Sequence, residues 1–366
     1  MAVYKIFPTA DTSIYSKYPA KNTGLDEILE VSVKNTEDST NSLIPGTGDF
    51  LTDDLRRCVI KFSNTDLATL KSYSTGSWKS YLRLYIADAE NITQEYSLEI
   101  KQVFQTWQAG TGKFADSPET RNGACWYTSQ SYYTTASNWV NPSYFITQGG
   151  GSWTSVSSSQ TFDLNANKDI NANVTNIVDS WFSSSYVNNG FLIKHTTSIE
   201  NNSGSYITLN YFSNDTHTIY PPSLDIRWDD SSYITGSLSI IDNSNCIITV
   251  ANNVGTFKAD TSIYKFRVNC RDKFPTRTFT TSSVYLNNKA LPATSYWSIQ
   301  DVKTNDIVVD FDTSYTKISC DSISSYFNMY MSGLEPERYY KLLIKTYLSS
   351  GEIIDVDNNL IFKIVK

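Results

Sequence analysis

The chain has 366 residues, a hydrophobic share of 40% and a formal net charge of −7, and it is long enough for two or three domains that each bury a core. The acidic balance argues against a nucleic-acid partner, because nucleic acid attracts a basic surface. No apolar run approaches the about 18 residues that a transmembrane helix needs, so we expect no membrane span.

Strand-like segments recur through the first part of the chain. Apolar and polar residues alternate within each segment and turn-forming residues separate the segments, which predicts antiparallel strands with one buried face. Aromatic residues make up 14% of the chain and accompany many Ser, Thr and Asn residues, as is typical of β-sandwiches with long loops. The expected strands cover residues 25–33, 57–62, 81–86, 97–103, 190–194, 206–212 and 224–228.

One segment of this part has a helical pattern. Residues 173–182 place Val174, Ile177, Val178 and Trp181 at positions i, i+3, i+4 and i+7. This spacing predicts a short amphipathic helix, with Asn173 as its N-cap, that closes one end of a sandwich.

Residues 110–160 are rich in Gly, Ser, Tyr and Trp. Loops of this length without internal order are unusual in compact domains. We therefore expect an ordered excursion over the sandwich that packs through Trp126, Trp139 and Trp153.

The composition changes near residue 229, because seven of the eight tryptophans precede it. Residues 229–232 (Asp-Asp-Ser-Ser) have the composition of a linker, so we expect domains at 1–229 and 230–366. The second domain should be a β-sandwich of about immunoglobulin size. Its expected strands cover residues 245–250, 263–270, 281–286, 296–300, 306–311, 325–331, 338–346 and 360–365.

Residues 333–345 resemble the Gly-Leu-x-Pro-x-x-x-Tyr pattern of fibronectin type III strands. In such sandwiches a tyrosine near the start of a strand bonds to upstream backbone and stabilises the corner. We expect this role for Tyr339 or Tyr340, and hence an Ig/fibronectin-III-like second domain.

The residue patterns of common catalytic and metal sites are missing. The chain has two histidines, His195 and His217, and neither has a recognisable nucleophile and carboxylate beside it in the sequence. Residues 110–113 (Gly-Thr-Gly-Lys) lack the spacing of a phosphate loop. The five cysteines are far apart, which favours buried, reduced thiols in a reducing cytoplasm over disulfides or a zinc site. We therefore predict that the chain has no catalytic residue, cofactor or metal site and that it is not an enzyme.

The surplus of aromatic and amide side chains leaves two interpretations open. Exposed Trp126, Trp139 and Trp153 could stack on sugar rings, which would make the chain a carbohydrate-binding module for host-surface glycans. The same residues could instead fill cores and subunit contacts, where Tyr and Trp are enriched. We favour the second interpretation.

Residues 8–229 resemble the DNRLRE-type domain in five segments that keep the family's order. These are the Ala-Asp-Thr opening at 9–14, the Arg-rich strand at 54–62, Leu-Arg-Leu within 81–86, Asn-Val-Thr with Trp181 at 173–181, and Asn-Gly-Phe at 189–194. Asn173 stands where many members have Asp, which argues against a cation at that position.

The resemblance implies an N-terminal jelly-roll-like β-sandwich. Residues 215–222, 274–291 and 326–345 are similar to a version of this architecture in tailed phages, where such proteins are virion structural proteins. The resemblance therefore implies a neck, collar, decoration, baseplate or fibre-attachment protein, assembled in the host bacterial cytoplasm. Its partners would be other virion proteins and copies of itself, and we expect the excursion and the C-terminal strand to make these contacts.

Overall fold

The computed structural model describes residues 2–34, 54–74, 76–131, 138–139, 149–202, 206–259, 263–275 and 287–366. The chain forms two compact units. The N-terminal unit comprises Ile6–Lys71 and Lys79–Asp225, and the C-terminal unit comprises Met1–Lys5, Ser72–Trp78 and Ile226–Lys366.

The division between the units differs in detail from the expected border at residue 229. It falls before Ile226, inside strand β12 (Ser223–Trp228), and not in the segment 229–232 that we expected to be a linker. Two short segments from the first third of the chain also belong to the C-terminal unit. The physical reason is aromatic packing within that unit, where Tyr330 contacts Tyr4, Tyr73 and Trp228 at centroid distances of 5.5, 5.5 and 5.3 Å.

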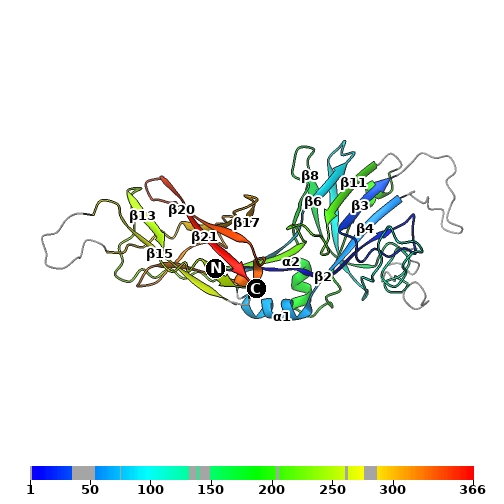
Figure 1. Ribbon diagram of the computed structural model, residues 1–366, viewed down its shortest axis with the longest axis horizontal. Coiled ribbons are helices and arrows are strands. Elements are labelled where there is room, and N and C mark those ends of the chain that lie inside the picture. Colours follow the sequence, from blue (N-terminus) through cyan, green and yellow to red (C-terminus); the bar gives the residue numbers. More distant parts are fainter. Residues whose placement is uncertain are drawn as a thin grey trace. The chain divides into compact units, whose positions relative to one another are not determined.

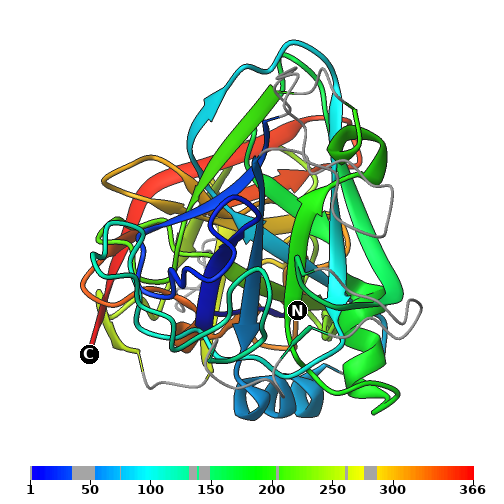
Figure 2. The same cartoon turned by 90° about the vertical axis from the view of Figure 1, so that its right-hand side faces the viewer.

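The N-terminal unit contains an eight-stranded sheet in the order β6-β11-β3-β4-β10-β7-β8, with β2 also paired to β4. Figure 2 shows the blue, cyan and green strands of this unit. The bounds are β2 Pro8–Tyr15, β3 Ile28–Lys34, β4 Asp54–Phe62, β6 Ile86–Glu90, β7 Tyr96–Val103, β8 Trp153–Phe162, β10 Phe191–His195 and β11 Tyr206–Phe212.

Strand β4 pairs edge to edge with three neighbours, and both faces of its central residues are buried. It pairs with β2 from Arg56 to Phe62, with β3 from Asp54 to Arg56, and with β10 from Cys58 to Ile60. Cys58, Val59 and Ile60 are fully buried. A strand covered on both faces needs apolar residues at successive positions instead of an alternating pattern.

Besides the eight-stranded sheet, the first part of the chain forms the paired strands β5 and β9 and three helices. Strand β5 (Trp78–Leu84) pairs with β9 (Ile170–Asn173). The helices are α1 (Asn64–Tyr73), α2 (Thr175–Phe182) and α3 (Thr197–Glu200). Strand β1 (Ala2–Ile6) precedes them in the chain. No helix in the described residues is long and apolar enough to cross a membrane.

Helix α2 confirms the amphipathic pattern, since Ile177, Val178 and Trp181 are buried. Its N-cap is Val174 and not Asn173, which is the last residue of β9. The Asn173 side chain still accepts a hydrogen bond from the backbone N–H of Thr175, at 3.1 Å. The expectation of a single helix in this part was wrong, since α1 is also helical. Its sequence did not predict a helix because its buried residues are Leu67 and Leu70, which form no broad apolar stripe.

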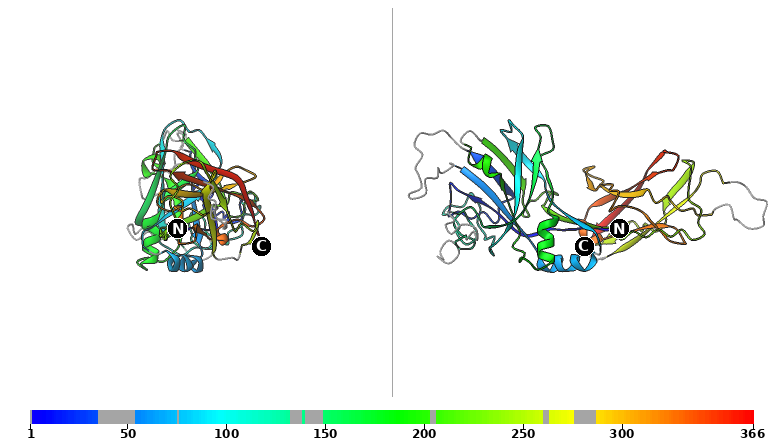
Figure 3. Two further views of the ribbon diagram at one scale, coloured as in Figure 1. Left: turned by 90° about the vertical axis from the view of Figure 1, so that its left-hand side faces the viewer. Right: turned by 180° about the vertical axis from the view of Figure 1, so that it is seen from behind.

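The C-terminal unit packs two sheets around one core (Figures 1 and 3), with the red strands β20 and β21 in one layer and the yellow-green strands β13 and β15 in the other. The four-stranded sheet has the order β13-β15-β19-β18 and the five-stranded sheet β14-β21-β20-β16-β17. Trp297 stacks on Phe327, and Phe327 on Phe266, at 5.1 and 5.3 Å. The bounds are β13 Cys246–Val250, β14 Thr256–Lys258, β15 Tyr264–Asp272, β16 Ser295–Asp301, β17 Ile307–Val309, β18 Ser319–Cys320, β19 Ser325–Met329, β20 Tyr339–Tyr347 and β21 Ile353–Val365, with a 3₁₀ turn at Met331–Gly333.

The predicted all-β class is confirmed, with mostly antiparallel sheets in sandwich-like arrangements. The strand expected at 281–286 lies outside the described residues.

Of the two candidate corner tyrosines of β20, Tyr340 is buried and donates its hydroxyl to the backbone carbonyl of Glu335 at 3.2 Å. Tyr339 is 54% exposed, because neighbouring residues of a strand point to opposite faces.

Candidate functional site

Of the three predicted contact tryptophans, Trp126 and Trp139 are buried within the N-terminal unit. Trp126 is 9% exposed and Trp139 only 1%, and the Trp139 indole Nε1–H donates to the Cys125 carbonyl at 2.8 Å. Neither ring has an open face for a sugar, so the stacking role proposed for these two residues is corrected. Trp153 is half-buried at the start of β8. The excursion therefore ends before Trp153 and not at 160, and its residues 132–137 and 140–148 lie outside the described part.

A buried ion cluster of Arg57, Lys194 and Glu200 lies beside these tryptophans. The Arg57 guanidinium donates to both carboxylate oxygens of Glu200, at 2.9 and 2.8 Å. The Lys194 ammonium donates to the same carboxylate at 2.8 Å. Strand β4 supplies Arg57, β10 supplies Lys194, and the short helix α3 supplies Glu200.

The charges of this cluster stabilise one another against burial. Burial alone would raise the pKa of Glu200, but Arg57 and Lys194 outweigh it and hold this pKa below its ordinary value. Burial, together with the nearby Arg57 cation, lowers the pKa of Lys194. We infer that these ion pairs stabilise the fold, because the loss of one charged partner would leave the opposite charge buried and uncompensated.

Arg57 also connects the cluster to the excursion. Its remaining terminal nitrogen donates to the Gly150 carbonyl at 2.7 Å, and its guanidinium lies 5.0 and 5.5 Å from the ring centroids of Trp126 and Trp153. Gly150 has φ +82°, and a Cβ atom there would lie 2.4 Å from the Arg57 nitrogen. The end of the excursion is thus held against the sheet by one buried side chain.

Asn22 holds the first half of the excursion. Its Nδ2 donates to the carbonyls of Ala109 and Ala124 at 2.5 and 2.8 Å, and its Oδ1 accepts from the N–H of Gly112 at 2.9 Å. Asn22 is fully buried. One amide therefore satisfies backbone groups from both arms of a loop, which makes the loop rigid.

An exposed aromatic patch is formed by Phe114 and Tyr127 of this loop and by Tyr18 of the segment that follows β2. The three side chains are 37, 36 and 45% exposed. The Tyr18 and Phe114 rings meet edge to face at 5.5 Å, and the Tyr127 N–H donates to the Pro19 carbonyl at 3.3 Å. The Lys21 ammonium lies 4.4 Å from the Phe114 centroid and donates to the Phe114 carbonyl. Exposed Tyr and Phe side chains of this kind are enriched at protein interfaces.

The two histidines lie in different surroundings. His195 is buried at the end of β10, where its ring contacts Tyr96 at 5.9 Å and burial lowers its pKa to about 4. The imidazole is therefore neutral at physiological pH. His217 is exposed, with its Nε2 3.6 Å from Glu27. Within the described residues, no group of three or more His, Cys, Asp or Glu side chains is placed to hold a metal ion.

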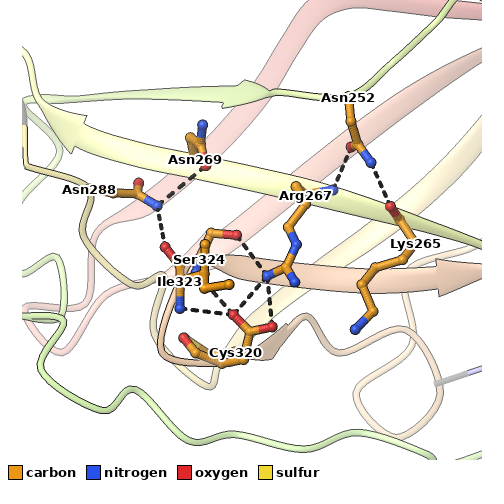
Figure 4. Close-up of polar contacts among 9 residues, drawn as sticks. Asn252, Lys265, Arg267, Asn269, Asn288, Cys320, Ile323 and Ser324 are labelled. Atoms are coloured by element: carbon orange, nitrogen blue, oxygen red, sulfur yellow. Dashed lines mark hydrogen bonds and ion pairs between the residues drawn. The ribbon is translucent and has the colours of Figure 1, made fainter.

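The C-terminal unit carries a polar face on its four-stranded sheet (Figure 4). We define it by Lys265, Arg267, Asn269 and Arg271 of β15, which alternate with buried Phe266, Val268 and Cys270. Arg267 donates to both oxygens of Asp321 at 2.7 Å and to Ser324 at 3.2 Å. The Asn252 side chain bonds the N–H of Arg267 and the carbonyl of Lys265, and so continues the β13–β15 pairing beyond Val250.

The C-terminal strand is covered at its end. Strand β21 pairs with β20 along one side, and its residues 363–365 pair with β14 in parallel on the other. Over these last residues the strand offers fewer free backbone groups for docking. Its proposed role as a contact strand therefore receives no support from the sheet order.

Sequence reasoning missed the residues that organise these features. Arg57 and Asn22 lie in or near segments that resemble the DNRLRE-type domain, but nothing in the sequence paired them with Glu200 or with the loop carbonyls. Comparisons with models of known protein families and with curated proteins found no match to this chain. The function of the chain is therefore inferred from its own residues and from its resemblance to the DNRLRE-type domain.

Proposed function

We propose that the chain is a structural or adaptor component of a tailed-phage virion, assembled in the cytoplasm of the host bacterium. It would act through contacts with other virion proteins and with copies of itself. The phage assignment is supported by the resemblance of residues 215–222, 274–291 and 326–345 to the tailed-phage version of the DNRLRE-type architecture.

The observation that carries the adaptor role is the aromatic patch on a rigid loop. Tyr18, Phe114 and Tyr127 are exposed, while Asn22 fixes the loop through three hydrogen bonds, two of them buried. A surface that is already ordered loses little conformational entropy when a partner binds. Exposed Tyr and Phe side chains then supply the apolar contact area on which protein interfaces depend.

The position of the chain can be tested in the virus that encodes it. Mass spectrometry of purified particles should detect the chain at a fixed stoichiometry to the other virion proteins. Particles made without it should take up the purified chain. Consistent absence from purified particles would refute the proposed function.

A surface variant tests the docking site separately. Phe114→Ser combined with Tyr127→Ser should lower uptake by particles at least about tenfold, since central aromatic contacts often contribute 2 kcal/mol or more. Tyr186→Ser is the matched control, because Tyr186 is 38% exposed and belongs to the same unit. Equal uptake of both variants would assign the contact to another surface.

A further inference from the structure

A shallow groove lies on the polar face of the C-terminal unit. In the register of the two strands, Arg271 of β15 is opposite Ile247 of β13, and Asn269 is opposite Thr249. Residues opposite one another on one face of a sheet have adjacent side chains. The groove has a volume of about 340 Å³ and is lined by Ile247, Thr249, Asn269, Cys270, Arg271 and Asn288.

One wall of this groove is held in place by Asn288. Its Oδ1 accepts from the N–H of Cys270 at 2.8 Å, and its Nδ2 donates to the Ile323 carbonyl at 3.0 Å and to Asn269 Oδ1 at 3.3 Å. Figure 4 shows the Asn269 carbonyl oxygen turned toward Asn288 and its amide nitrogen turned away. The Asn269 side chain is therefore oriented before any ligand arrives.

The polar face concentrates positive charge on a chain whose net charge is −7. Arg267 is neutralised by Asp321, and the Lys265 ammonium lies 4.1 Å from the Tyr326 ring centroid. Arg271 donates to the Asp272 carbonyl at 3.1 Å. Among the described residues, no carboxylate lies within ion-pair distance of the Arg271 guanidinium, whose planar fork matches a carboxylate.

We propose that this groove binds an acidic sugar residue of a polysaccharide. The Arg271 guanidinium pairs with the sugar carboxylate, while the Asn269 amide and the Thr249 hydroxyl bond neighbouring ring hydroxyls. An amide and a hydroxyl on adjacent strands both donate and accept, as sugar hydroxyls require. An acidic sugar engages all three groups at once, because one ring carries both the carboxylate and the hydroxyls, whereas a glutamate side chain carries the carboxylate alone. The inference goes beyond the virion role and depends on different residues.

Titration calorimetry with the full chain tests this site with three probes. These are a short oligomer of galacturonic acid, the neutral galactose oligomer of equal length, and polyglutamate. The acidic oligomer should bind, more weakly as salt is added, and the neutral oligomer should not bind measurably. Arg271→Gln should weaken binding by about tenfold or more, since a bidentate charge-assisted pair is lost.

Two further variants make the result specific to the groove. Lys303→Gln removes one exposed cation from the turn between β16 and β17, in the other sheet of the same unit, and should leave the affinity unchanged. Asn269→Ala, at an exposed position, should weaken binding even if Arg271→Gln reduces folding. The proposal is overturned if the acidic oligomer does not bind, if Arg271→Gln or Asn269→Ala binds it as the wild type does, or if polyglutamate binds as tightly.

Discussion

The Arg57 guanidinium donates two hydrogen bonds to the Glu200 carboxylate, 143 residues further along the chain. This pair joins the shared strand β4 to helix α3, and Arg57 extends the connection to Gly150 at the end of the excursion. The Gly150 end of the excursion is therefore anchored to the folded unit, while Asn22 holds its first half.

Removing the carboxylate of this pair should strongly destabilise the protein. Glu200→Gln leaves two buried cations, Arg57 and Lys194, without their shared anion, so we expect a loss of about 3–5 kcal/mol in the free energy of unfolding. Denaturant unfolding measures this loss. Glu27→Gln, at a side chain that is 50% exposed, is the control and should change the free energy by about 0.5 kcal/mol or less. Equal effects of the two changes would contradict the structural role of the cluster.

Asp11 should make stability depend on pH. Burial raises its pKa to about 7, although the N–H of Asn214 donates to its carboxylate at 2.7 Å. Since the unfolded pKa is about 3.9, the folded state keeps a proton that the unfolded state has lost. The stabilisation that this proton provides is complete below about pH 4 and is lost as the pH rises to about 7.

Asp11→Asn removes this titration, because an amide has no proton to lose. Relative to the wild type, the variant should gain stability between about pH 4 and pH 7, by an amount on the order of 2–4 kcal/mol. Urea unfolding at several pH values measures the difference. Asp163→Asn, at an exposed residue of the same unit, should show a flat difference. A flat difference for Asp11→Asn would contradict the raised pKa.

Asn22 should control the rigidity of the excursion. Asn22→Ala leaves the carbonyls of Ala109 and Ala124 and the N–H of Gly112 without their buried partner, which costs about 1–3 kcal/mol. Amide hydrogen exchange in residues 105–125 should become faster. Asn122→Ala, which removes exposed hydrogen bonds to Thr111 in the same loop, should have a smaller effect. Unchanged exchange in Asn22→Ala would show that other contacts hold the loop.

The two adjacent tyrosines of β20 should differ in their contribution to stability. Tyr340→Phe loses the hydrogen bond to the Glu335 carbonyl and should lower the free energy of unfolding by about 0.5–1.5 kcal/mol. Tyr339→Phe changes an exposed side chain and should have an effect of about 0.5 kcal/mol or less. Thermal unfolding of both variants is a direct comparison, and a larger loss in Tyr339→Phe would contradict the assignment.

Local patterns in the sequence determined the fold class and most elements. Strand β11 covers the same residues, 206–212, as the predicted strand, because alternation reports one buried and one exposed face. Helix α2 followed from four apolar residues at helical spacing. Helix α1 was not predicted, because its two buried leucines lie on a mostly polar segment and form no clear apolar stripe.

Only the tertiary structure decided which side chains meet and which are exposed. Composition alone could not show that Trp126 and Trp139 are buried while Tyr18, Phe114 and Tyr127 are exposed. The pairing of Arg57 with Glu200 depends on where β4 and α3 lie in the folded unit. Sequence periodicity reports the environment of a residue along its own strand or helix, whereas burial and ion pairing depend on segments that are distant in the chain.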